Sequence, residues 1–184
     1  MIVLGLDPGT RHFGWGVVER VGTRLVHRAH GIVHTDTSQS IADRLVQIEA
    51  ELVDVVSANK PQWASVESLF FAKDAQAAAK LGHARGVALL VCARAGLLIA
   101  EYAPALVKRA VAGGGRAEKS QVAQMVRIIL ALTSPPPSDA ADALAVAVTH
   151  LQRIPYMTAV QAVSAARAAP RSARPLEART ARMK

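Results

Sequence analysis

The chain has 184 residues, of which 51% are hydrophobic and only 4% aromatic, and its formal net charge is +8. This length suits one domain plus a terminal segment, with a core built mainly from aliphatic side chains. The single cysteine, Cys92, excludes an internal disulfide framework. Because the sequence has no signal peptide and no run of about 18 apolar residues, we expect a cytosolic protein without a membrane span.

The first part of the chain predicts three strands, a helix and a fourth strand. Residues 2–7 are almost continuously apolar, as in a strand buried on both faces. Residues 13–20 and 24–35 indicate two further strands joined as a hairpin by a short turn. Apolar residues at helical spacing predict a helix over 40–57, and residues 63–67 form the next predicted strand.

The second part of the chain is mainly helical. A long helix is predicted over 74–95, a fifth strand over 97–102, and helices over 104–111, 118–132 and 139–151. The order is therefore β-β-β-α-β-α-β-α-α-α. Three antiparallel strands followed by strands with helical crossovers predict an α/β fold, with a five-stranded mixed sheet flanked by helices on both faces.

Positive charge is concentrated at the C-terminal end. Residues 153–184 hold seven Lys or Arg and one acid, a net charge of +6, whereas residues 1–152 have a net charge of only +2. The 153–184 segment is rich in Ala, Arg and Pro, so we expect a disordered tail after a single domain spanning 1–152. Such a tail is typical of segments that bind polyanions, and simple solvation of the charges is the alternative.

Four carboxylates define the candidate site. Asp7 and Glu67 end two of the predicted strands, while Asp139 and Asp142 open an alanine-rich predicted helix and share one of its faces. Taken singly, Asp7 fits a turn and the Asp139–Asp142 pair fits an ordinary helix start. Their convergence at one sheet edge, in a basic chain, instead predicts a site for divalent cations and chemistry on phosphate.

The histidines give no comparable metal signal. His27, His30 and His34 fall on one predicted strand, at offsets of three and seven. Because side chains alternate between the two faces of a strand, we expect these imidazoles to be separated rather than gathered on one metal. Oxygen ligands for Mg²⁺ or Mn²⁺ are therefore favoured over a zinc site.

Four motifs together resemble the RuvC family of bacterial Holliday-junction resolvases. They are Asp7-Pro-Gly-Thr, the segment 66–73, the segment 117–122 and Asp139-Ala-Ala-Asp142, in the family's order and spacing. The resemblance covers residues 1 to about 151. It implies a ribonuclease H-like fold and a homodimer that nicks four-way DNA junctions, with the RuvA–RuvB branch-migration complex as a partner.

The resemblance also implies roles for individual residues. The family's four catalytic and metal-binding acids correspond to Asp7, Glu67, Asp139 and Asp142, with two Mg²⁺ or Mn²⁺ ions per site. Its DNA-binding residues correspond to an aromatic side chain and two lysines: Phe70, Lys108 and Lys119. The hypothesis is hydrolysis that leaves 5′-phosphate and 3′-hydroxyl ends.

Two alternatives stay open at this point. Another ribonuclease H-like nuclease, acting on a different structured nucleic acid, would retain the same carboxylates, since fold does not fix function. A non-catalytic junction-binding protein would use only the basic surface and tail. The four acids weigh against that second alternative, because without cations they would repel DNA.

Overall fold

The computed structural model describes residues 1–68 and 75–168, with side chains for all of these except 75–77 and 155–168. It contains one five-stranded sheet whose strands lie in the order β3-β2-β1-β4-β5. The strands are β1 (Ile2–Asp7), β2 (His12–Val21), β3 (Arg24–His34), β4 (Trp63–Glu67) and β5 (Leu98–Tyr102). The helices are α1 (Ile41–Asn59), α2 (Ala75–Arg94), α3 (Pro104–Ala112), α4 (Lys119–Ile129) and α5 (Ser138–Ala168).

The sheet is mixed, as the sequence predicts. Strands β1, β2 and β3 pair antiparallel, whereas β4 is parallel to both β1 and β5. The predicted order of strands and helices is confirmed, with element boundaries that differ mostly by one to three residues. Within the described ranges, no helix is both long enough and apolar enough to cross a membrane.

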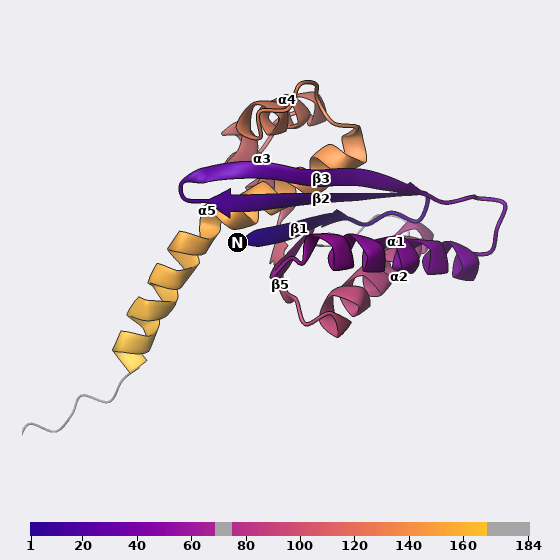
Figure 1. Cartoon of the computed structure of the whole chain (residues 1–184), viewed down its shortest axis with the longest axis horizontal. Coiled ribbons are helices and arrows are strands. Elements are labelled where there is room, and N and C mark those ends of the chain that lie inside the picture. Colours follow the sequence, from indigo (N-terminus) through magenta and orange to yellow (C-terminus); the bar gives the residue numbers. More distant parts are fainter. Residues whose placement is uncertain (69–74, 169–184) are drawn as a thin grey trace, which may run out of the picture. The chain divides into compact units, whose positions relative to one another are not determined.

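Two apolar cores lie on the two faces of the sheet. On one face, Leu4 and Leu6 of β1 pack with buried residues of α1 and α2. On the other face, Val3 of β1 packs with buried residues of α3, α4 and α5. Figure 1 shows α1 and α2 on one side of the strands and α4 on the other. Because neighbouring residues of β1 face opposite ways, its continuous apolar run serves both cores.

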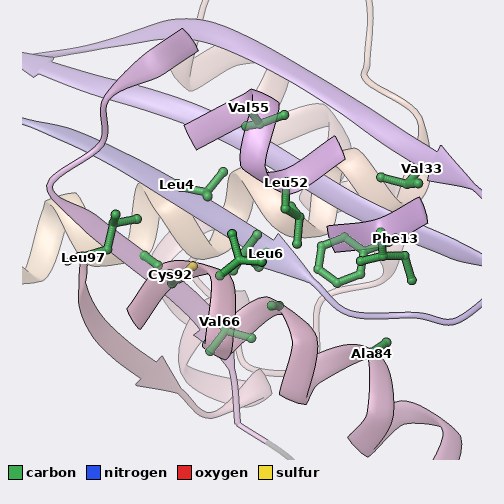
Figure 2. Packing of buried hydrophobic residues seen from close by; sticks show 14 of the residues in the cluster. Leu4, Leu6, Phe13, Val33, Leu52, Val55, Val66, Ala84, Cys92 and Leu97 are labelled. Atoms are coloured by element: carbon green, nitrogen blue, oxygen red, sulfur yellow. The ribbon is translucent and has the colours of Figure 1, made fainter. Parts of the chain in front are cut away.

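The first core is aliphatic around one large aromatic ring. Figure 2 shows Phe13 beside Leu52 and Leu6, with Val66 and Cys92 in the same cluster. Burial raises the pKa of the Cys92 thiol to about 11, so this side chain is a buried apolar group rather than a reactive thiolate.

Glycines let helix α5 lie directly against β1 and β2. A Cβ atom at Gly5 would lie 1.9 Å from the Ala143 carbonyl oxygen, and one at Gly14 would lie 2.1 Å from the Asp139 carbonyl oxygen. Side chains at these two positions would hold the helix away from the strands. The glycines therefore bring the first turns of α5 close to the end of β1.

Helix α5 extends further than the sequence predicts. It continues to Ala168, whereas the pattern predicted an end near residue 151 and disorder from 153 onward. Residues 153–168 are therefore helical in the structure, in keeping with the high helix propensity of their alanines. The chain divides into two units, Met1–Gln152 and Arg153–Lys184. The predicted disorder of 169–184 lies outside the described residues.

A β-bulge changes the expected placement of the histidines. Val17 pairs with Ala29 but Val18 pairs with His27, so β3 has one extra residue there, Arg28. The bulge places His27 Nε2 2.8 Å from His30 Nδ1. The prediction that strand alternation separates these two imidazoles was therefore wrong. His34 lies apart from them and contacts His12 on β2, with their Nδ1 atoms 3.0 Å apart.

Candidate functional site

Asp7 and Glu67 lie at the same edge of the sheet. Each is the last residue of its strand, and the two strands are parallel neighbours with Leu6 paired to Val66. Since the carboxyl ends of parallel strands meet at one edge, both carboxylates lie where ligands of α/β proteins commonly bind. Both side chains are partly buried.

Helix α5 supplies the other two acids. Asp139 is the second residue of this helix and Asp142 follows one turn later. Both carboxylates act electrostatically on Asp7, and their helix is packed against β1 and β2 through the glycine contacts. The predicted convergence of the four carboxylates is therefore present in the structure.

Three of the acids and two lysines line one pocket of about 210 Å³. Its charged lining residues are Asp7, Glu67, Asp142, Lys108 and Lys119. Lys119 Nζ lies 2.9 Å from Asp142 Oδ2, and this ion pair raises the pKa of Lys119. The pocket therefore brings oxygen ligands together with cations that suit a phosphate group.

The pKa values of Asp7 and Glu67, the two acids that end strands, are both raised. Burial is the main cause that lifts the pKa of Asp7 from 3.8 to about 7, followed by the charges of Asp142 and Asp139. The pKa of Glu67 is raised mainly by burial and then by Asp142. Positive charge nearby favours the ionised forms, and Lys119 lowers the pKa of both acids. The site thus has more negative charge than its own lysines neutralise.

This donor set fits a hard divalent cation. All the candidate ligands are carboxylate oxygens. Burial and the neighbouring acids both raise the pKa of Asp7, and a bound cation would favour its ionised form. Among the described side chains, no group of three or more His, Cys, Asp or Glu residues lies close enough together to hold a metal ion by itself. A divalent cation at this edge would therefore complete its coordination with waters and with oxygens of a phosphate substrate.

A second pocket adjoins the first. It measures about 380 Å³ and shares Asp7 with the lysine-lined pocket. Its other charged or titratable lining residues are Arg11, His12, Lys80 and Asp139. Asp139 thus faces a different pocket from its helical neighbour Asp142, so the acids border two hollows rather than one.

Arg85 fixes the backbone beside the site. This buried arginine of α2 donates from Nη1 to the Glu67 carbonyl oxygen at 2.6 Å. Its Nη2 lies 2.7 Å from Glu101 Oε2 on β5. The guanidinium therefore ties α2 to the ends of β4 and β5 next to the Glu67 carboxylate. Sequence analysis missed Arg85, since nothing in its local pattern marks a buried arginine.

Of the three predicted DNA-binding residues, the structure describes the two lysines but not the phenylalanine. Lys108 of α3 and Lys119 of α4 both line the acidic pocket. Phe70 lies outside the described residues, as do its neighbours Phe71, Lys73 and Asp74.

The glycines that bring α5 close to the strands were not predicted as parts of the site, although glycines within apolar strands can signal a close approach.

Comparisons with known proteins match one and the same family along nearly the whole chain. The family model of the crossover junction endodeoxyribonuclease RuvC matches residues 3–150. The RuvC of Sorangium cellulosum is 58% identical over 179 residues, which cover 97% of this chain and 99% of that protein. The RuvC of Cereibacter sphaeroides is 51% identical, covering 84% of this chain and 91% of that one. This chain belongs to the RuvC family.

Solved structures confirm the RuvC architecture and the expected ribonuclease H-like fold. T. thermophilus RuvC in complex with a Holliday junction substrate has a TM-score of 0.78 and 39% identity, covering 82% of this chain and 93% of that chain. The yeast mitochondrial Holliday junction resolvase Ydc2 has a TM-score of 0.63, covering 89% of this chain and 83% of that chain. At 11% identity, Ydc2 shares the fold alone.

Proposed function

We propose that this RuvC-family chain is an endonuclease that resolves four-way DNA junctions by hydrolysing phosphodiester bonds. The observation that carries the proposal is the convergence of four carboxylates around adjoining pockets lined by lysines and an arginine. Membership of a family of crossover junction endodeoxyribonucleases supports the same substrate.

In the proposed mechanism, two Mg²⁺ or Mn²⁺ ions would be held by Asp7, Glu67, Asp139 and Asp142. When bound, such ions polarise the phosphate, activate an attacking water and stabilise the leaving 3′ oxygen. Asp7 would be the central ligand, because this residue lines both pockets and interacts electrostatically with all three other acids.

The lysines have a separate proposed role. Lys119 Nζ is paired with Asp142, so the approach of a phosphate would offer this ammonium group a second anionic partner. There Lys119 would stabilise charge that develops on the phosphate oxygens, while Lys108 would bind a neighbouring phosphate. Both lysines lie on the pocket wall formed by α3 and α4.

Paired nicking requires two active sites, so we propose a homodimer whose two-fold symmetry matches that of the junction. A small-residue face of α2, around Gly82 and Gly86, is the candidate dimer surface. No described atom lies within 4 Å of a Cβ atom built at either glycine, apart from neighbouring residues and the helix's own nearby backbone. This openness disfavours intrachain packing as their role. The RuvA–RuvB complex stays a proposed partner.

The first experiment measures strand cleavage of a mobile four-way junction, a linear duplex and an RNA–DNA hybrid of matched sequence. Each substrate is incubated with Mg²⁺, Mn²⁺ or EDTA, using the unmodified chain and Asp7→Asn. The proposal predicts paired nicks in the junction only, with 5′-phosphate ends, that need a divalent metal and are lost in the variant.

Other outcomes would assign a different function. Cleavage of the hybrid would retain the metal site but identify another ribonuclease H-like nuclease. Tight junction binding without cleavage under either metal would identify a non-catalytic junction-binding protein. A monomer in sedimentation at high concentration, together with unpaired nicks, would contradict the symmetric mechanism.

A further inference from the structure

The acidic edge, which is the sheet edge where the four carboxylates lie, has a pocket lined by basic residues on each of two sides. The turn over residues 8–11 joins β1 to β2 and lines the larger pocket, whereas Glu67 at the end of β4 lines the smaller one. Because β1 lies between β2 and β4 in the sheet, the two pockets lie on opposite sides of the Asp7 end of β1. Lys108 and Lys119 belong to the β4 side only.

The larger pocket has its own cations. Arg11 and Lys80 line it, and both side chains are exposed. Neither forms an ion pair among the described side chains, whereas Arg28, Arg85 and Arg94 all do. Unpaired cations beside a cluster of acids leave a basic rim that can accept anions once the acids are neutralised by metal.

The turn that carries Arg11 is held in place by side chains from other elements. Thr35 Oγ1 donates to the Thr10 carbonyl oxygen at 2.6 Å, and Arg44 Nη2 of α1 donates to the same oxygen. The Arg11 carbonyl in turn accepts from the Thr35 amide at 3.1 Å. A Cβ atom at Gly9 would lie 2.2 Å from the His12 carbonyl oxygen, so this position requires glycine for the turn to close. The pocket wall is therefore preformed.

We propose that this pocket is a second backbone subsite, in which Arg11 and Lys80 each bind a phosphate of the cleaved DNA strand. The strand crosses the acidic edge with its scissile phosphate over Asp7. Phosphates on one side of it contact Lys108 and Lys119, and phosphates on the other side contact Arg11 and Lys80. This subsite rests on the proposed nuclease function and adds the path that the strand follows through the site.

The subsite is tested with the full-length double variant Arg11→Gln/Lys80→Gln. Binding of a four-way junction is measured over a range of salt concentrations in an Asp7→Asn background, which prevents cleavage. Loss of two phosphate contacts should lower the slope of log affinity against log salt by about 1.4 to 1.8. The matched control is Arg24→Gln, an exposed arginine at the far end of the β2–β3 hairpin.

Cleavage separates a binding subsite from a catalytic role. In the otherwise unmodified chain, the double variant should require a higher enzyme concentration but retain, within about threefold, the single-turnover rate on saturated junction. A salt slope equal to that of Arg24→Gln would overturn the subsite even if the unmodified chain cleaves junctions normally. If the unmodified chain neither binds nor cleaves junctions, the proposed function itself fails, a result distinct from failure of the subsite alone.

Discussion

Asp7 is held in a folded environment that opposes its ionisation. In the unfolded chain its carboxyl ionises near the ordinary pKa of 3.8, whereas in the metal-free folded protein the pKa is about 7. Between these values the unfolded chain binds fewer protons, so the stability of the metal-free protein decreases as pH rises from about 4 to about 7. The difference between the two pKa values corresponds to a loss of at most about 4 kcal/mol. Because the side chain is partly exposed, solvent screening makes the loss smaller than this limit.

Replacing Asp7 with Asn should therefore stabilise the metal-free protein. In EDTA we expect Asp7→Asn to unfold at a higher temperature than the unmodified chain at pH 8, and the difference should vanish near pH 4. Thermal unfolding as a function of pH measures this, with the exposed Asp54→Asn of α1 as the control. Parallel curves for the unmodified chain and Asp7→Asn would contradict the assigned shift in the pKa of Asp7.

Arg85 is expected to position Glu67 rather than to touch substrate. Replacing it with Met keeps most of the buried volume but removes the hydrogen bond to the Glu67 carbonyl oxygen. Glu101 is 51% exposed and can regain water, so the cost of about 1–3 kcal/mol falls mainly on the partly buried Glu67 carbonyl. Urea unfolding measures this loss, and a higher Mg²⁺ concentration for half-maximal cleavage would show that Glu67 is less well placed.

The control for Arg85 is Arg94→Met, which breaks an ion pair with Glu49 whose side chains are 68% and 40% exposed. Such a pair contributes little, so its stability should change by about 0.5 kcal/mol or less. If Arg85→Met loses stability but needs no more Mg²⁺ than the unmodified chain, Arg85 has a structural role only.

At the scale of elements, the contact between helix α5 and the β1–β2 pair governs the site. A methyl group at Gly14 would overlap the Asp139 carbonyl oxygen, so Gly14→Ala should move the start of the helix and its two acids. We expect a loss of about 1–3 kcal/mol in stability together with a larger loss of cleavage. Thermal unfolding and junction cleavage at saturating Mg²⁺ measure the two effects.

Gly114→Ala is the comparison for this overlap. No described atom outside its chain neighbours lies within 4 Å of a Cβ atom at Gly114, so its stability should stay within about 1 kcal/mol of the unmodified chain. Equal effects of the two substitutions would mean that close packing under α5 does not set the position of the acids.

Much of this arrangement could be predicted from the sequence because the signals are local. The apolar runs that end at Asp7 and Glu67 fix both the strands and the edge at which the carboxylates lie. The spacing of Asp139 and Asp142 fixes their common helix face. The mixed sheet and its two-sided core follow from the sequence of elements, since parallel strands need crossover helices that cover the sheet.

Features that depend on tertiary contacts could not be predicted in this way. The bulge at Arg28 brings His27 and His30 together against the alternation of a regular strand, and its register is set by pairing with β2. Arg85 is buried because its two partners come from β4 and β5, at the ends of other elements. The raised pKa of Asp7 likewise depends on tertiary structure, first through burial and then through acids far away in the sequence.

At the scale of the whole molecule, the positive charge of 153–184 is expected to increase affinity without choosing the cleavage site. A variant can replace five arginines of this segment with glutamine: Arg167, Arg171, Arg174, Arg179 and Arg182. Binding to junction and to duplex should weaken by similar factors, because phosphate contacts carry no sequence information. Electrophoretic binding assays and mapping of the nicks measure both properties, and a shifted cleavage position would contradict this role.

The two-sided core gives each layer its own optical reporter. The chain has only two tryptophans, Trp15 and Trp63. Trp15 packs against the core beneath α1 and α2, whereas Trp63 packs against the core beneath α3, α4 and α5, with its ring centroid 4.6 Å from that of His150. Fluorescence from single-tryptophan variants, Trp15→Phe and Trp63→Phe, would therefore follow the loosening of each layer separately. Coincident transitions would mean that the sheet couples the layers into one cooperative unit.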